Sequence, residues 1–180
     1  MVGYDGGRPL SGDRLGESLD HVLWMGRALE LARQAAAAGE IPVGAIVVHH
    51  PAGAVPRVIG EGFNRREAEH DCSAHAEIVA MRLAGRELKS WRLLDCTLYV
   101  TLEPCPMCAG AMVQARLPRV VFGCVDPKAG AVETLYKICS DGRLNHRVEV
   151  VGGVCAEAAA AVLRDFFADR RGKNETGPKG

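Results

Sequence analysis

The residues best suited to chemistry form two short clusters, H-A-E at residues 75–77 and P-C-P-M-C at residues 104–108. One imidazole and two thiols supply three ligands for zinc, and a zinc ion with three protein ligands keeps its fourth position open for water. An open position is what separates catalytic zinc sites from closed structural ones. The carboxylate of Glu77 is left to carry protons beside that position. The two clusters therefore predict a catalytic zinc centre.

The spacing also predicts how the ligands are positioned. Cys105 and Cys108 lie three residues apart at the start of a predicted helix, so their side chains share one face. The positive end of a helix lowers the pKa of a thiol and favours the thiolate that binds metal. His75 lies near the start of another predicted helix. We therefore expect two helix N-termini to meet at the metal.

The sequence also allows a second, larger set of zinc ligands. Cys72 and His75 form a C-x-x-H pair, and with Cys105 and Cys108 they could make a closed Cys₃His site. Such a site would describe a non-catalytic, zinc-stabilised binding module. Glu77 beside the metal would be an unusual choice for a purely structural site, so the catalytic interpretation is favoured.

Hydrophobic periodicity places these clusters in an α/β domain. A three-layer αβα fold is expected, in which about five helices flank a mixed five-stranded sheet that begins with a hairpin. Residues 1–17 and 172–180 are expected to be a disordered arm and tail around one domain, 18–171. The expected strands are 43–48, 58–63, 96–101, 119–123 and 148–151, and the expected helices are 19–38, 74–83, 104–114, 132–139 and 156–170.

Composition narrows the class of protein. The 180 residues carry 22 basic and 22 acidic side chains, and this zero net charge argues against a non-specific RNA binder. No apolar stretch approaches the roughly 20 residues that span a bilayer, and the first residues do not resemble a secretory signal. Seven cysteines, an odd number, suggest no disulfide framework. We expect a cytoplasmic protein that does not contact membranes.

Beyond the zinc motif, the chain resembles the bacterial tRNA-specific adenosine deaminases, a family with the cytidine deaminase-like fold. The resemblance extends from about residue 19 to residue 171. The matching blocks are I-P-V-G-A at 41–45, G-F-N-R at 62–65, A-H-A-E-I at 74–78, L-Y-V-T-L-E-P-C-P-M-C-A-G-A at 98–111, R-V-V-F-G at 119–123, N-H-R at 145–147 and D-F-F at 165–167.

The resemblance implies a reaction and a cofactor. The protein would convert the wobble adenosine of a tRNA anticodon stem-loop to inosine and release ammonia, as a homodimer without an organic cofactor. One Zn²⁺ per subunit would be held by His75, Cys105 and Cys108. Zinc-activated hydroxide would attack the base, and Glu77 would act as the proton shuttle.

The resemblance also implies substrate contacts. Asn64 and the backbone N–H of Ala76 would face the base, and Asp126 and Lys128 would belong to a loop that contacts anticodon nucleotides. Two of these residues also have an ordinary structural explanation. Asn64 could be a turn former, and Asp126, which is followed by proline, could start a turn.

The same zinc chemistry would serve a deaminase of free guanine or cytosine. Neutral charge mildly favours that alternative, whereas the matching blocks outside the zinc motif favour tRNA more strongly.

Overall fold

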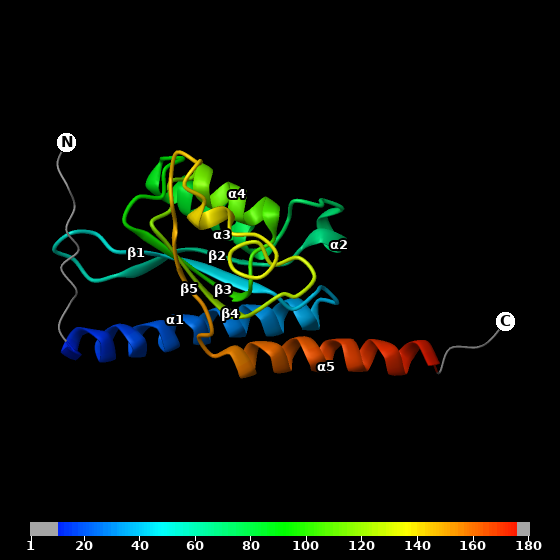
Figure 1. The fold of residues 1–180 in the computed structure, drawn as a ribbon. Coiled ribbons are helices and arrows are strands. Elements are labelled where there is room, and N and C mark those ends of the chain that lie inside the picture. The colour runs from blue at the N-terminus through cyan, green and yellow to red at the C-terminus, as the bar shows by residue number, and fades with distance from the viewer. Residues whose placement is uncertain (1–10, 176–180) are drawn as a thin grey trace.

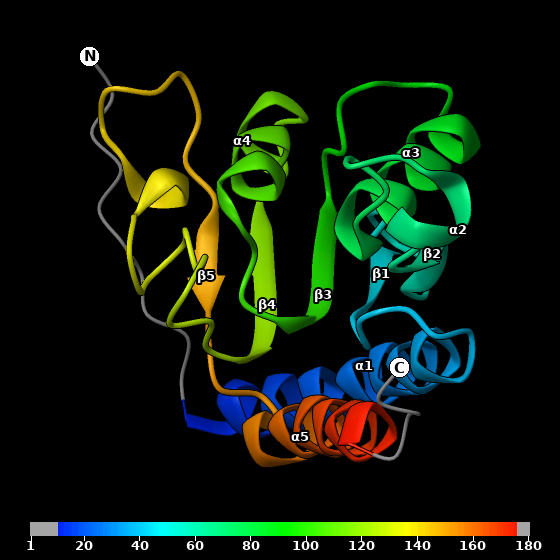
Figure 2. The same cartoon turned by 90° about the vertical axis from the view of Figure 1, so that its right-hand side faces the viewer.

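The computed structural model describes the backbone of residues 11–175 and the side chains of residues 20–171. One mixed sheet lies between two helical layers (Figure 1). Helices α1 and α5 lie side by side on one face, and α3 and α4 cover the other (Figure 2). The expected three-layer αβα fold is therefore confirmed.

Five strands form the sheet in the order β2-β1-β3-β4-β5. β2, β1 and β3 are antiparallel neighbours, while β3, β4 and β5 run parallel. The parallel half requires crossovers, which α4 and a long irregular segment provide. The strands are β1 (Gly44–His49), β2 (Arg57–Phe63), β3 (Cys96–Leu102), β4 (Arg119–Cys124) and β5 (Glu149–Val151).

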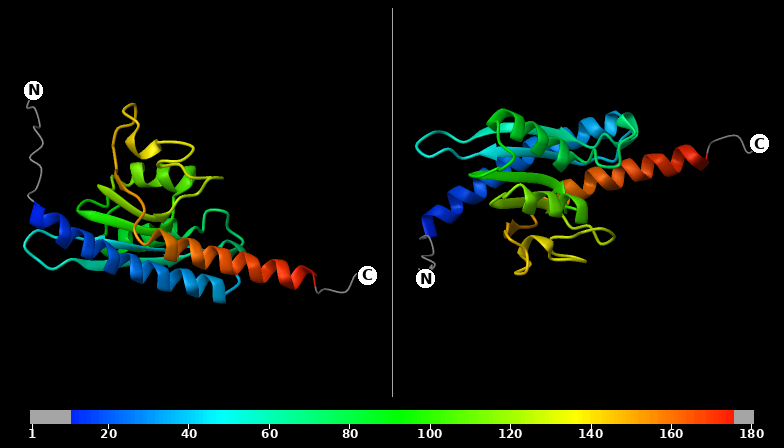
Figure 3. Two further views of the ribbon diagram at one scale, coloured as in Figure 1. Left: turned by 60° about the horizontal axis from the view of Figure 1, so that its bottom comes forward. Right: turned by 90° about the horizontal axis from the view of Figure 1, so that it is seen from above.

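The helices differ widely in length. Two long ones, α1 and α5, run along the same face of the sheet (Figure 3). The described helices are α1 (Ser11–Ala37), α2 (Arg66–Glu69), α3 (Ala76–Leu88), α4 (Pro106–Gln114) and α5 (Ala156–Glu175), with a 3₁₀ turn, η1, at Ile138–Ser140. No described helix is long and apolar enough to cross a membrane.

The sheet is buried on both faces because successive side chains of the central strands point into different cores. In β1, Ile46 packs towards α1 and α5, whereas Val47 packs towards α3 and α4. In β3, Tyr99 joins the first core and Val100 the second. This explains why these strands are nearly continuous apolar runs.

Glycines on β2 bring the sheet unusually close to α3. A Cβ atom on Gly62 would lie 2.6 Å from the carbonyl oxygen of Ala76, and one on Gly60 would meet the carbonyl oxygen of Ala80. Backbone therefore rests on backbone here, with no side chain between. The contact at Gly62 fixes the first turn of α3, next to the H-A-E cluster.

Both long helices extend beyond their expected ends. α1 begins at Ser11, so it overlaps the expected disordered arm, and α5 continues to Glu175, into the expected tail. Glycines weaken helices but do not stop them as proline does, and no proline interrupts either helix. Residues 1–10 and 176–180, the rest of the expected arm and tail, lie outside the described residues.

The expected helix at 132–139 is wrong. This segment is irregular apart from η1, because its N–H groups do not bond to the carbonyl oxygen four residues back: those of Leu135 and Ile138 donate to Gly130 and Ala131 instead. The buried side chain of Glu103 lies against the start of the segment. Its Oε1 accepts hydrogen bonds from the backbone of Val132, Glu133 and Thr134 at 3.3, 2.9 and 2.8 Å. Its Oε2 accepts the backbone N–H of Asp126 at 3.0 Å and the Thr134 hydroxyl.

We call this arrangement the Glu103 cradle: one carboxylate that accepts hydrogen bonds from residues 126 and 132–134. Burial raises the pKa of Glu103, but the hydrogen bonds from Thr134 and its neighbours outweigh it and hold that pKa below its ordinary value. The cradle therefore holds an ionised side chain that ties the segment after β4 to the end of β3.

Candidate active site

The three predicted metal ligands meet where α3 and α4 begin. His75 directly precedes α3, Cys105 directly precedes α4, and Cys108 lies in the first turn of α4. His75 Nδ1 lies 3.6 Å from each sulfur, and all three ligand atoms are within 4.8 Å of one another. Tetrahedral bonds of about 2.3 Å to sulfur and 2.0–2.1 Å to nitrogen imply a separation of about 3.6 Å. The geometry fits zinc.

The pKa shifts of the two cysteine thiols also favour the binding of a cation. Hydrogen bonding from Cys108 lowers the pKa of Cys105 to about 4, and His75 contributes in the same direction. The pKa of Cys108 is raised, because it holds the shared proton and is buried. A divalent ion that displaces this proton would be held by two thiolates and one neutral imidazole, a formally neutral set.

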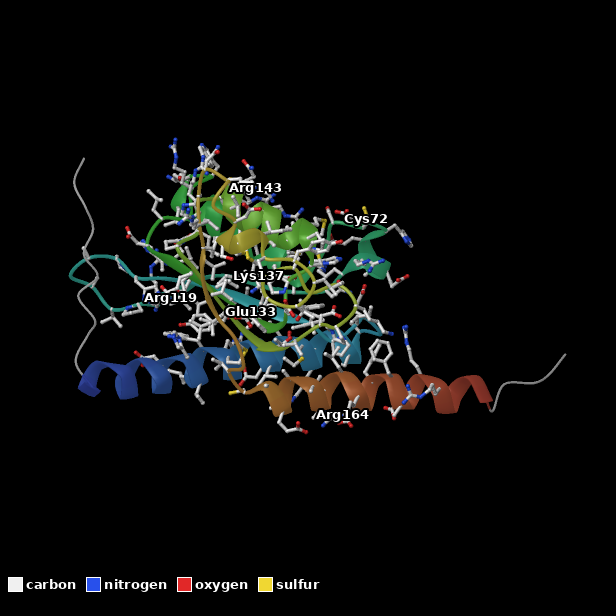
Figure 4. The ribbon with its side chains drawn as sticks, in the orientation of Figure 1. Cys72, Arg119, Glu133, Lys137, Arg143 and Arg164 are labelled. Carbon is white, nitrogen blue, oxygen red and sulfur yellow. The ribbon has the colours of Figure 1, made fainter. Side chains whose placement is uncertain are left out.

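Cys72 does not join this group. Its side chain is exposed on the loop between α2 and α3 (Figure 4), and among the described residues only His75, Cys105 and Cys108 cluster as metal ligands there. The closed Cys₃His alternative therefore lacks its fourth ligand in this structure.

A cavity of about 190 Å³ opens beside the ligands. It is smaller than the roughly 300–1,000 Å³ of drug-sized pockets, which suits one flat base. Larger hollows elsewhere on the described surface contain none of the three metal ligands. The lining residues are Ile41, Val43, Asn64, Arg66, His75, Ala76, Glu77, Leu102, Glu103, Cys105, Asp126 and Ala129.

Glu77 lies within this cavity wall and is only 4% exposed. Burial raises the pKa of its carboxyl group. A raised pKa brings a carboxyl group closer to the range in which it both takes up and releases protons near neutral pH. The position of Glu77 and its raised pKa suit the proton-shuttle role that the resemblance implies.

Asn64 and Ala76 also line the cavity. Ala76 is the first residue of α3, whose first-turn N–H groups have no partner within the helix. The Asn64 side chain is 5% exposed, and its Nδ2 donates a hydrogen bond of 2.9 Å to Glu40 Oε2. Glu40 was not singled out from the sequence. Only its position before the I-P-V-G-A block could have suggested a role.

The loop residues separate into two kinds. Asp126 lines the cavity, but its Oδ1 accepts the N–H groups of Lys128 at 2.9 Å and Ala129 at 3.2 Å, so the side chain shapes a turn. Lys128 is exposed and does not line the cavity. The two residues therefore share a loop but not a position in the site.

Comparisons with known proteins agree with this geometry. The tRNA-specific adenosine deaminase of Haemophilus influenzae is 47% identical over 144 residues, which cover 80% of this chain and 81% of that protein. A structure solved in a study of tRNA:A34 deaminases and A-to-I editing at the wobble position is 41% identical with a TM-score of 0.72, covering 78% of this chain and 98% of its own.

The guanine deaminase of Nitrosomonas europaea has a similar structure, with a TM-score of 0.69 and 29% identity, covering 82% of this chain and 84% of its own. The MafB19-like deaminase family model matches residues 19–171, most of the chain. The three clustered ligand residues, Glu77 and the residues that line the cavity all fall within the matched range. The chain therefore belongs to the MafB19-like deaminase family.

Proposed function

We propose that this protein deaminates the wobble adenosine of a tRNA anticodon stem-loop, converting adenosine and water to inosine and ammonia. The observation that carries the proposal is that three clustered ligand residues, a buried carboxyl group and a buried amide line or adjoin one cavity of the size of a base. The activity of the Haemophilus influenzae relative supports the choice of substrate. Because tRNA is the substrate, the cytoplasm is the proposed location.

One Zn²⁺ per subunit is proposed at His75, Cys105 and Cys108, where it would supply a water molecule with its pKa lowered to about 7. Glu77 takes a proton from the attacking water and passes it to a ring nitrogen of the base. As the C–N bond to the amino group breaks, Glu77 takes the second proton from the added oxygen, which becomes the carbonyl, and delivers it to the departing nitrogen, which leaves as ammonia. The buried surroundings of Glu77 keep bulk water from competing for these protons.

Other residues hold the substrate in this proposal. Asn64 and the backbone N–H of Ala76 contact the base inside the cavity. Arg66, an exposed residue on the cavity wall, and Lys128, on the neighbouring loop, are suited to phosphate groups of the anticodon. Asp126 contributes by shaping that loop, since its carboxylate already accepts two backbone hydrogen bonds.

We also propose a homodimer. Trp91 is 60% exposed beside a hollow of about 570 Å³ between α3 and α4, where the partly exposed Ile78, Ala111 and Ala115 provide apolar surface. Exposed apolar surface of this kind is typical of an interface. Sedimentation velocity would test this: the protein should sediment as a dimer, and Trp91→Glu should shift it towards the monomer.

The decisive assay offers the zinc-loaded protein an anticodon stem-loop with adenosine at the wobble position, and separately free guanine and cytosine. Inosine should form in the stem-loop, and the free bases should release little ammonia. If guanine releases ammonia and the stem-loop gains no inosine, the result would instead support guanine deamination, the activity of the Nitrosomonas europaea neighbour.

Metal analysis of two variants separates the catalytic centre from a structural zinc module. Cys72→Ala should retain zinc and activity, because Cys72 lies outside the ligand group. Cys105→Ala should lose both. Loss of zinc from Cys72→Ala would restore the Cys₃His alternative.

A further inference from the structure

Glu40 is a buried acidic residue in the turn between α1 and β1, and only 1% of it is exposed. Its two carboxylate oxygens serve different partners. Oε2 accepts the Asn64 side-chain amide at 2.9 Å, and Oε1 accepts the backbone N–H of Ala68 at 2.8 Å. Burying a carboxylate is costly unless such bonds compensate, so this arrangement requires a reason beyond packing.

Glu40 is itself held firmly by the turn in which it lies. Its backbone N–H donates to the carbonyl oxygen of Ala35 at 2.9 Å, and Gly39 before it adopts a φ of +80° that closes the helix end. From α5, the guanidinium of Arg170 donates to the Gly39 carbonyl oxygen at 2.8 Å. The carboxylate is thus presented from a fixed piece of backbone.

Asn64 is held on its other side by backbone. Its N–H donates to the carbonyl oxygen of Val43 at 3.1 Å, and it follows directly after β2. A carboxylate only accepts hydrogen bonds, so the amide nitrogen must be the atom that faces Glu40. Glu40 therefore determines which way round the amide lies.

The orientation of the Asn64 amide decides which atoms of a purine it can bond to. An asparagine amide pairs with adenine by donating N–H to N7 and accepting from the 6-amino group. A flipped amide would present oxygen to N7, where two acceptors would repel. After bonding to Glu40, the Asn64 amide keeps one N–H and its oxygen for this purpose.

We propose that Glu40 is a positioning residue for base recognition: it locks the Asn64 amide in the single orientation that can bind the N7 edge of a purine. This inference rests on the proposed function, since it assigns Asn64 to the substrate base. Glu40 acts only through Asn64 and does not line the cavity.

Glu40→Gln tests whether Glu40 orients the Asn64 amide, because it changes the hydrogen-bonding groups with little change in side-chain shape. Glutamine offers one acceptor oxygen where Glu40 serves two donors, Asn64 and Ala68. If its NH₂ group faces Asn64, the amide must flip to accept from it. If the NH₂ group faces Ala68 instead, two donors oppose each other. The variant therefore weakens or reverses the orientation of the amide.

The measurement compares two stem-loops, one with adenosine and one with 7-deazaadenosine at the wobble position, in which N7 is replaced by C–H. The kcat/KM ratio of the two substrates, compared between variants, cancels their intrinsic difference in reactivity. We expect Glu40→Gln to lower kcat/KM for adenosine by about 10- to 100-fold, as for other residues that orient active groups. The preference for adenosine over the 7-deaza substrate should shrink by about the same factor.

Three controls accompany this variant. Asn64→Ala should shrink the preference equally, and adding Glu40→Gln to it should have no further effect. Glu61→Gln changes a glutamate of β2 that pairs with Arg27 outside the cavity, so it should leave both rates unchanged. Zinc content should stay at the parental level in every variant.

The outcomes are distinct. If the parent protein makes no inosine, the proposed function fails. If it does, and Glu40→Gln keeps the parental preference for adenosine over the 7-deaza substrate, the inference about Glu40 is overturned alone. A merely structural role would slow both substrates equally and leave the preference intact. Should Glu40→Gln not fold, Glu40→Asp replaces it, because a side chain shorter by one methylene cannot serve both donors.

Discussion

Removing the Glu103 cradle provides a sensitive test of how the cavity wall is held. In Glu103→Ala, four backbone N–H groups and the Thr134 hydroxyl lose their acceptor. Hydrogen bonds to a charged group contribute about 1.5–3 kcal/mol each, and a buried donor left without a partner costs about 1–3 kcal/mol. Glu133 and Thr134 are exposed, so water can replace the acceptor there, whereas Val132 is buried.

With water solvating the exposed donors, we expect Glu103→Ala to lower the free energy of unfolding by about 3–5 kcal/mol. Glu103→Gln keeps one acceptor oxygen and places an NH₂ group near the N–H of Asp126 or the N–H groups of 132–134. It should cost about 1–3 kcal/mol. Glutamine has nearly the volume of glutamate, so the cost of Glu103→Gln measures the lost acceptor alone, whereas Glu103→Ala adds the loss of side-chain volume.

Urea unfolding of the zinc-loaded protein measures both losses, and amide hydrogen exchange locates them. Exchange should accelerate at residues 126 and 132–134 in both variants, and stay slow in the central strand β3. If Glu103→Ala unfolds within 1 kcal/mol of the parent, or if Glu103→Gln is as stable as the parent, the acceptor argument is wrong.

Three further predictions use other parts of the structure. Glu77→Gln should reduce kcat by about 10²- to 10⁴-fold and retain zinc by metal analysis, since it removes only the proton carrier. Gly62→Ala should lower the free energy of unfolding in urea by about 1–3 kcal/mol, because its Cβ would press against α3. A hydrogen bond from Arg27 lowers the pKa of Glu61 from 4.5, so the pair stabilises the protein above that pH and less as pH falls through the lowered value. In urea, Glu61→Gln should cost at most about 1 kcal/mol at pH 7, and this cost should disappear in acid; an unchanged cost in acid would contradict the assignment.

The elements that the sequence predicted well are those with a strong local pattern. All five strands were anticipated to within one or two residues, because continuous or alternating apolar runs end at glycine, proline or charged residues. The same holds for α4, which begins at a proline pair. The pairing of Cys105 and Cys108 also follows from local spacing, because they lie one helix turn apart, whereas the motif in which His75 stands had to be matched to them across 30 residues.

What the sequence did not predict depends on contacts between distant residues. Glu103 bonds to amides about 30 positions later, in a segment that local propensity wrongly assigned to a helix. Glu40 and Asn64 are 24 positions apart, and nothing in the residues between them indicates that they pair. Such carboxylates resemble ordinary surface charges until the fold brings their donors together.

The glycine contact between β2 and α3 limits how this scaffold can change. Where two main chains touch, repacking cannot alter their spacing, since no side chain is available to enlarge or trim. Glu77 lies in the first turn of the helix seated at that contact, so the depth of its carboxyl group in the cavity is fixed by the backbone. New substrates would have to be accommodated by the surrounding loops, whose lengths and side chains remain adjustable.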